Sequence, residues 1–177
     1  MIRAVVFDWG DTVMRNLPGF GGPMVEWPVV EVVPGIEEAL PALHGTYKLA
    51  MATNAQDSGT ELVRAALRRV GLETCFDFVL TARDLGAGKP DPRFFAALVA
   101  HLGCRADEVV MIGDDYETDV AGAREAGLGA IWFNEPGAPC PRERPLHDAE
   151  VSNMADLPDV LERLQSGRVG KRGEEDR

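Results

Sequence analysis

The chain has 177 residues, enough for one domain with a sizeable core, and its 29 acidic and 18 basic residues give a net charge of −11. This excess of carboxylates disfavours nucleic acid and anionic membranes as general partners, because phosphate groups are bound by Lys and Arg. No apolar run approaches the ~20 residues of a membrane span. Cys75, Cys104 and Cys140 lie far apart without a CxxC pair, so we expect a soluble cytoplasmic protein with reduced thiols.

Short apolar runs alternate with helical patterns along the chain. This alternation predicts an α/β fold of the Rossmann-like three-layer type, with a central parallel sheet and helices on both faces. The expected strands are Ala4–Phe7, Leu49–Ala52, Phe78–Leu80, Val109–Ile112 and Ala130–Phe133. The expected helices are Gly35–His44 (shortened or kinked by Pro41), a segment capped by Asp57 or Ser58 and ended by Gly71, Pro92–Leu102, Thr118–Ala126, and a last helix capped by Asp156.

The domain boundaries follow from the same pattern. We assign residues 1–166 to a single domain, because the strands and helices follow one another without a long linker. Residues 167–177 are small and charged, so we expect a disordered tail there.

Polar residues stand where the expected strands end, at the edge of the sheet where open α/β folds bind their ligands. They are Asp8, Thr53, Asn54, Asp114 and Asp115. Taken singly, each has a plainer interpretation, since Asp and Asn are common in turns and at helix caps. A further charged residue, Lys89, lies between them in the Gly- and Pro-rich stretch GAGKPDP.

Polar residues after three strands, with a lysine before the third, follow one another in an order that resembles the motifs of the haloacid dehalogenase (HAD) superfamily. This is a superfamily of aspartate-nucleophile phosphohydrolases. The resemblance covers almost the whole chain and is strongest in the stretches GKPDPRFF and IGDDYETDVAGAREAG, which look like the phosphoglycolate-phosphatase-like branch. It implies a HAD-type core and Mg²⁺-dependent hydrolysis of a phosphate ester or acyl phosphate through an aspartyl-phosphate intermediate.

A metal site is expected because a carboxylate and a phosphate repel each other at attack distance. The resemblance implies that Asp8 is both the nucleophile and a Mg²⁺ ligand. Asp114 and the backbone carbonyl of Gly10 would complete the protein ligands, and Asp119 would support the metal site from outside the ligand set. Asp115 either accepts a hydrogen bond beside the metal ligands or caps the following helix.

A phosphate pocket is expected next to this metal site. Thr53 and Asn54 can donate hydrogen bonds to phosphoryl oxygens. Lys89 can neutralise the nucleophile and the substrate, and stabilise the charge that spreads over the transferring group in the transition state.

The first motif departs from the family pattern Asp-x-Asp-Gly-Thr. It reads Asp8-Trp9-Gly10-Asp11-Thr12, with glycine where the family has its general acid–base aspartate. Such a group typically contributes about 10²–10⁴ in rate. We favour the hypothesis that Asp11 takes over this role. In the alternative, Asp11 only caps the turn and no acid is present. Aryl and acyl phosphates, which have good leaving groups, should then still be cleaved, whereas alkyl phosphates should be poor substrates.

The chain also has no room for the helical cap domain that family members acting on small metabolites usually carry. An uncapped site suits a bulky substrate (a protein, an oligosaccharide or a nucleotide end), or a second subunit closes it in a homo-oligomer. Segment 16–33 contains three large apolar residues, Phe20, Met24 and Trp27. We expect them either to form an apolar flap over the site or to belong to the core, which is the commoner place for aromatic residues.

Two other functions compete with a phosphatase. Gly10 keeps open a catalytically weak HAD-fold binding or regulatory protein. A haloacid dehalogenase is disfavoured, because those enzymes carry a cap, need no metal and lack the acidic metal motif. The substrate itself is not encoded in any pattern that we recognise.

Overall fold

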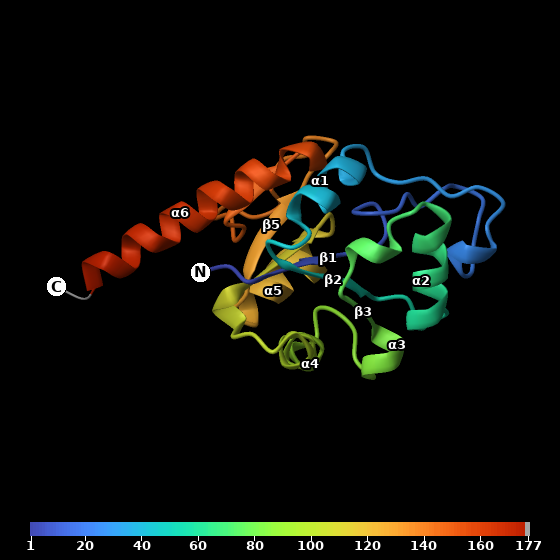
Figure 1. The fold of residues 1–177 in the computed structure, drawn as a ribbon, viewed down its shortest axis with the longest axis horizontal. Helices are drawn as coiled ribbons and strands as arrows, with labels where there is room; N and C mark the ends of the chain where they lie inside the picture. The colour runs from blue at the N-terminus through green and yellow to red at the C-terminus, as the bar shows by residue number, and fades with distance from the viewer. Residues whose placement is uncertain (176–177) are drawn as a thin grey trace.

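The computed structural model describes the backbone of residues 1–175 and the side chains of residues 1–167. Its centre is a six-stranded sheet, parallel throughout, with strand order β3-β2-β1-β4-β5-β6 (Figure 1). The strands are β1 Ala4–Phe7, β2 Lys48–Thr53, β3 Phe78–Thr81, β4 Val109–Gly113, β5 Gly129–Phe133 and β6 Ala149–Val151. The predicted fold class is confirmed. Strand β6 was missed because three residues are too few to show a period.

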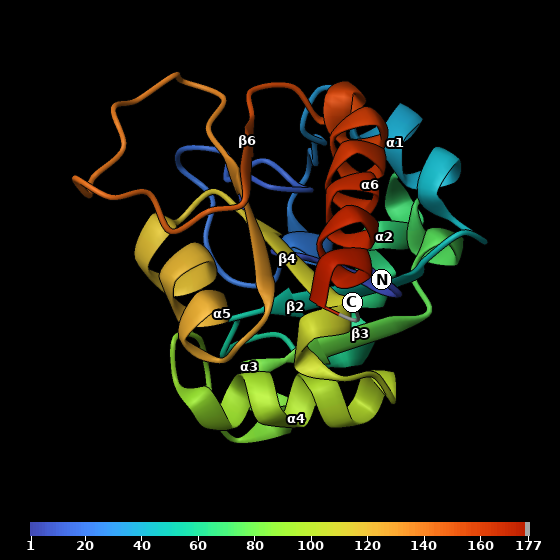
Figure 2. The ribbon, with the colours of Figure 1, turned by 90° about the vertical axis from the view of Figure 1, so that its left-hand side faces the viewer.

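Helices cover both faces of this sheet (Figure 2). They are α1 Ile36–Leu43, α2 Thr60–Arg69, α3 Ala82–Leu85, α4 Pro92–Leu102, α5 Gly122–Glu125 and α6 Leu157–Glu175. Short 3₁₀ turns are η1 Met24–Glu26, η2 Glu73–Cys75, η3 Ala106–Glu108 and η5 Met154–Asp156, and η4 Tyr116–Ala121 is a π-helical segment that runs into α5.

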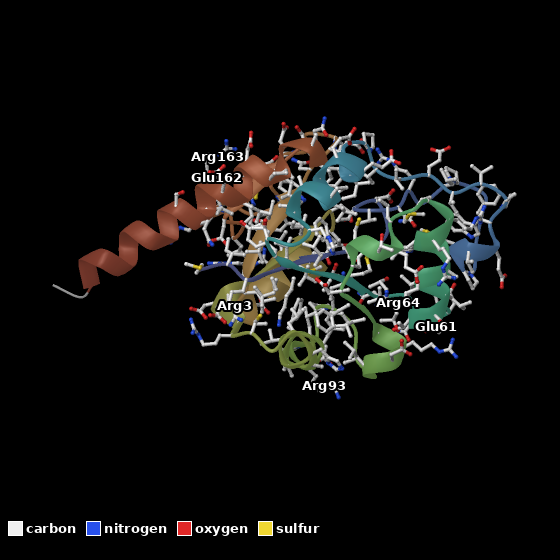
Figure 3. All side chains as sticks on the ribbon, in the orientation of Figure 1. Arg3, Glu61, Arg64, Arg93, Glu162 and Arg163 are labelled. Carbon is white, nitrogen blue, oxygen red and sulfur yellow. The ribbon has the colours of Figure 1, made fainter. Side chains whose placement is uncertain are left out.

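Two apolar layers hold the helices to the sheet, and β1 contributes to both because its side chains alternate between faces. Val5 and Phe7 pack with α1, α2 and α6 on one face. Ala4 and Val6 pack with α4 and α5 on the other. Charged side chains labelled in Figure 3, such as Glu61 on α2, lie on the outer surface. The sheet is therefore buried on both faces, and a strand end is fixed in place by the core.

The helix starts differ from the sequence expectation at three places. Helix α2 begins at Thr60, and neither Asp57 nor Ser58 caps it; Asp84 accepts the Thr60 backbone N–H at 2.8 Å instead. The helical segment after β4 begins at Tyr116 rather than Thr118. Before α6, the capping side chain is Asn153 rather than Asp156. Caps supplied from a distant element, such as Asp84, leave no local signal.

Helix α6 continues through Glu175, whereas the sequence suggested a disordered tail from residue 167. Figure 1 shows the end of α6 projecting beyond the rest of the domain. Residues 176 and 177 lie outside the described residues. None of the helices up to residue 175 combines the length and apolar character that a membrane crossing requires.

The connections between the first three strands are short. Between β1 and β2 the chain forms a loop, η1 and α1, and between β2 and β3 it forms α2 and η2. Within the described residues these connections contain only that loop and these helices and turns.

Candidate active site

The carboxylates that follow β1 and β4 lie together at one edge of the sheet. β1 pairs with β4, and the Asp8 backbone N–H donates to the Ile112 carbonyl at 2.8 Å. Asp8, Asp114 and Asp119 each offer a carboxylate oxygen, and these oxygens lie within 4.8 Å of one another. Asp119 is almost fully buried, whereas Asp8 and Asp114 are half-buried. The sequence motifs thus converge on an oxygen-rich cluster that suits a hard cation such as Mg²⁺.

Lys89 is buried against this cluster. Its side chain is 1% exposed, and its Nζ donates to Asp8 Oδ1 at 2.5 Å and to Asp119 Oδ1 at 2.7 Å. Burial acts to lower the pKa of Lys89, but the negative charges of Asp8 and Asp119 outweigh it and raise the pKa above its usual value. Lys89 is therefore a fixed ammonium group between two carboxylates.

Asn54 holds Lys89 in position. Its side-chain Oδ1 accepts the Lys89 backbone N–H at 2.7 Å, and its Nδ2 donates to the Lys89 carbonyl at 2.9 Å. The structure shows that Asn54 positions the lysine, and Asn54 also lines the cavity beside Asp8. Its role as a phosphate donor stays a prediction, since Nδ2 carries a second hydrogen. Thr53, at the end of β2, is buried and lines the same cavity as Asp8, with its Oγ1 accepting the Ala55 backbone N–H.

Two carboxyl groups of the cluster have raised pKa values. Burial, together with the charge of Asp8, raises the pKa of Asp114 to about 6. Burial also raises the pKa of Asp119 to about 7, against the opposing influence of the Lys89 ammonium. Crowded carboxylates with raised pKa values are common at functional sites, since a bound cation or substrate relieves the repulsion.

Asp115 caps the helical segment η4. Its Oδ1 accepts the backbone N–H groups of Glu117 at 3.0 Å and Thr118 at 2.9 Å. Of the two alternatives for this residue, the structure shows the cap.

Thr12 is a site residue that the sequence motifs did not single out. Its Oγ1 donates to Asp114 Oδ1 and accepts the Asp114 backbone N–H, both at 3.1 Å. Trp132 Nε1 donates to the Asp114 carbonyl at 3.0 Å. These contacts orient Asp114 from two separate elements. The signal that could have identified Thr12 is its place at the end of the first motif.

The Asp11 carboxylate is held by Asn16. The Asp11 φ of 54° is left-handed, which Asp tolerates in turns, and its carboxylate accepts the Asn16 backbone N–H at 3.1 Å and Asn16 Nδ2 at 2.9 Å. Asp11 lines a smaller cavity with Arg15, Asp114 and Glu135, and it is not among the residues that line the cavity beside Asp8. These contacts favour the turn-cap alternative, and the replacement of the missing acid by Asp11 stays a prediction.

The cavity beside the carboxylate cluster, called the main cavity below, has a volume of about 440 Å³. It extends from the cluster to segment 16–33. Gly22, Met24 and Trp27 of that segment line it. Met24 and Trp27 are each 8% exposed and belong to the core, while Phe20 is 42% exposed and stacks on Trp27. Met24 and Trp27 are therefore core residues, as one of the two interpretations predicted, and they also form one wall of the cavity, while a flap stays a prediction.

An α/β core that gathers aspartates from neighbouring strand ends around a buried lysine defines a class of hydrolases. Residues 22–127 match the haloacid dehalogenase-like hydrolase family, and the chain belongs to that family. The matched range includes Lys89, Asp114 and Asp119 and begins after Asp8.

Two curated relatives of the chain are named as phosphatases. The chain is 38% identical over 106 residues to ribulose-1,5-bisphosphate 5-phosphatase of Halopiger xanaduensis, covering 59% of this chain and 43% of that protein. It is 40% identical over 86 residues to phosphoserine phosphatase of Thermus thermophilus, covering 49% of this chain and 33% of that protein. The match thus spans less than half the length of each of these two relatives.

Solved structures share the fold over nearly the whole chain. An uncharacterised protein from Listeria monocytogenes serotype 4b has a TM-score of 0.82 and 27% identity, covering 93% of this chain and 99% of that one. A 2-haloacid dehalogenase from Pseudomonas syringae pv. Tomato DC3000 has a TM-score of 0.77 and 26% identity, covering 93% of this chain and 100% of that one.

Proposed function

We propose that this protein is a Mg²⁺-dependent phosphohydrolase that acts on a phosphate ester or acyl phosphate through an aspartyl-phosphate at Asp8. The observation that carries this proposal is the cluster of Asp8, Asp114 and Asp119 oxygens within 4.8 Å, with the Lys89 ammonium buried between Asp8 and Asp119. The phosphatase names of the curated relatives support the same reaction class.

The residues present fit a magnesium ion. The donors are all oxygens, and burial together with the charge of Asp8 raises the pKa of Asp114, an effect that a bound divalent cation would oppose. Asp8, Asp114 and the Gly10 carbonyl would hold the ion, with Asp119 supporting them through Lys89. When bound, the ion neutralises phosphate charge beside the nucleophile.

The chain's own residues divide the reaction between them. An Asp8 carboxylate oxygen forms a bond to phosphorus as the bond to the leaving oxygen breaks. Lys89 holds Asp8 and balances the charge on the transferring group, and Thr53 donates to a phosphoryl oxygen. Water then attacks the phosphorus of the aspartyl-phosphate, which returns the Asp8 carboxylate and releases phosphate.

The experiment is hydrolysis of p-nitrophenyl phosphate and acetyl phosphate with Mg²⁺ or with a chelator. We expect turnover that requires the metal and falls by at least ~10³-fold in Asp8→Asn, because an amide is not a nucleophile here. Asp107→Asn, which removes the same charge from the exposed side chain in η3 before β4 begins, is the matched control and should retain activity. Absence of turnover above the Asp8→Asn background, in protein shown to be folded, would favour the catalytically weak binding protein.

We further propose a cytoplasmic location. The three cysteines are free thiols in the structure, as a reducing compartment would keep them.

A further inference from the structure

Asn16 occupies the space beside Gly10 at the main cavity. A Cβ atom built on Gly10 would come within 2.5 Å of Asn16 Nδ2. The Asn16 carboxamide therefore stands where a side chain at position 10 would begin. Asn16 lines the same cavity as Asp8 and Asp114, whereas Asp11 does not.

Hydrogen bonds to Asp11 fix this carboxamide. The Asn16 backbone N–H and one Nδ2 hydrogen go to the two carboxylate oxygens of Asp11, at 3.1 and 2.9 Å. The amide nitrogen of Asn carries two hydrogens. The second has no acceptor among the residues that the structure describes, so it is available to a molecule in the cavity.

We propose that Asn16 donates this N–H to the leaving oxygen of the substrate, and that the protein consequently selects phosphates whose leaving group departs as a stable anion. This inference rests on the proposed function and deepens it. A carboxamide can stabilise developing negative charge but cannot give up a proton at neutral pH. Carboxylates and acidic phenolates need no proton to leave, whereas alkoxides do. The substrate class is therefore acyl and aryl phosphates rather than sugar or other alkyl phosphates.

The balanced steps show where the electrons go. An Asp8 oxygen bonds to phosphorus, the bond from phosphorus to the leaving oxygen breaks, and its electron pair stays on that oxygen. Asn16 donates a hydrogen bond to the departing carboxylate or phenolate. A water oxygen then bonds to phosphorus, the bond from phosphorus to Asp8 breaks, and the water proton passes to solvent.

The test is a series of substituted phenyl phosphates with leaving phenols of decreasing acidity, together with acetyl phosphate and glycerol phosphate. We expect kcat/KM to fall steeply with the leaving-group pKa, and glycerol phosphate to be cleaved least. Asn16→Leu keeps the size of the side chain without an N–H. It should slow the least acidic phenols roughly ten- to hundredfold and acetyl phosphate much less, which steepens the dependence. Asn16→Ala should act in the same direction.

Asp107→Asn, in the exposed turn η3, is the control and should leave the leaving-group dependence unchanged. Asp11→Asn tolerates the left-handed turn but loses one of the two oxygens that fix Asn16, so it should steepen the dependence in the same direction as Asn16→Leu and by less. An Asn16→Leu variant that slows every substrate by the same factor would overturn the inference, as would a steeper dependence in Asp11→Asn than in Asn16→Leu, which would make Asp11 the acid. Loss of turnover in Asp8→Asn with no slope change in Asn16→Leu leaves the proposed function intact. Absence of metal-dependent turnover in the unaltered protein overturns both.

Discussion

At the scale of single residues, the site depends on the buried ammonium group of Lys89, which forms ion pairs with two carboxylates. Lys89 has a desolvated ammonium group, and only its contacts with Asp8 and Asp119 offset the cost of burying that charge. Removing one member of such a group leaves charge in the interior without a partner. Lys89 therefore contributes to stability as well as to chemistry.

Lys89→Met should lower the free energy of unfolding by about 3–5 kcal/mol in metal-free protein, because Asp8 and Asp119 then lose their counter-ion. Urea denaturation in the presence of a chelator measures this. The matched control is Lys48→Met, since Lys48 makes a single hydrogen bond to the Leu102 carbonyl at 2.7 Å and should cost about 1 kcal/mol. The double variant Lys89→Met/Asp119→Asn should recover part of the stability without activity. Equal losses in Lys89→Met and Lys48→Met would contradict the assignment.

At the scale of elements, side-chain hydrogen bonds connect helix α2 to two segments that lie far from it in the sequence. Asp84 in α3 accepts hydrogen bonds from the Thr60 backbone N–H, Thr60 Oγ1 and Thr81 Oγ1, and so links α2 to the end of β3. Arg69 at the end of α2 donates to the carbonyls of Val25 at 3.0 Å and Trp27 at 2.5 Å, and so holds segment 16–33 against the helix. These links place the cavity wall relative to the carboxylate cluster.

Asp84→Asn should lower stability at neutral pH by about 1 kcal/mol, because the charged cap of α2 is lost. The hydrogen bonds from Thr60 lower the pKa of Asp84 below its ordinary value. Because the pKa of Asp84 is lower in the folded protein than in the unfolded chain, its carboxylate stabilises the fold at pH values above the unfolded pKa of about 4. This stabilisation is lost as the pH falls through the pKa of Asp84 in the folded protein. The difference between the two proteins should therefore be constant from about pH 7 to 5 and shrink below about pH 4.

Thermal unfolding across this pH range measures the effect. Asp107→Asn, which removes an exposed carboxylate paired with Arg105 on the surface, should change stability by less than about 0.5 kcal/mol. A difference for Asp84→Asn that grows on acidification would contradict the capping role.

At the scale of the whole molecule, the proposed metal site joins residues from distant parts of the chain. Asp8 follows the central strand β1, and Asp114 and Asp119 come from β4 and η4 further along the chain. An ion that binds these carboxylates only when they are brought together stabilises the folded state by mass action.

Saturating Mg²⁺ should therefore raise the melting temperature relative to chelator. At a hundredfold excess over Kd, the gain of ~2.7 kcal/mol corresponds to roughly 5–10 °C for a chain of this size. Differential scanning fluorimetry measures the shift, and Asp114→Asn should abolish most of it while Asp107→Asn preserves it. A shift that is the same in both variants would place the metal elsewhere.

The sequence by itself determined the parallel α/β fold, the order of the strand-end carboxylates and the presence of Lys89 among them. These signals are local, since hydrophobic runs define strands, and polar residues after them mark the ligand edge of the sheet. Only the tertiary structure decided the roles of Thr12, Asn16, Asn54 and Asp84. Thr12 contacts Asp114 across 102 positions of sequence, and Asn54 contacts Lys89 across 35. Asn16 and Asp11 acquire their roles from the direction in which a left-handed turn points their side chains. Such contacts depend on where the folded backbone brings distant residues together, and residue patterns along the chain do not record that.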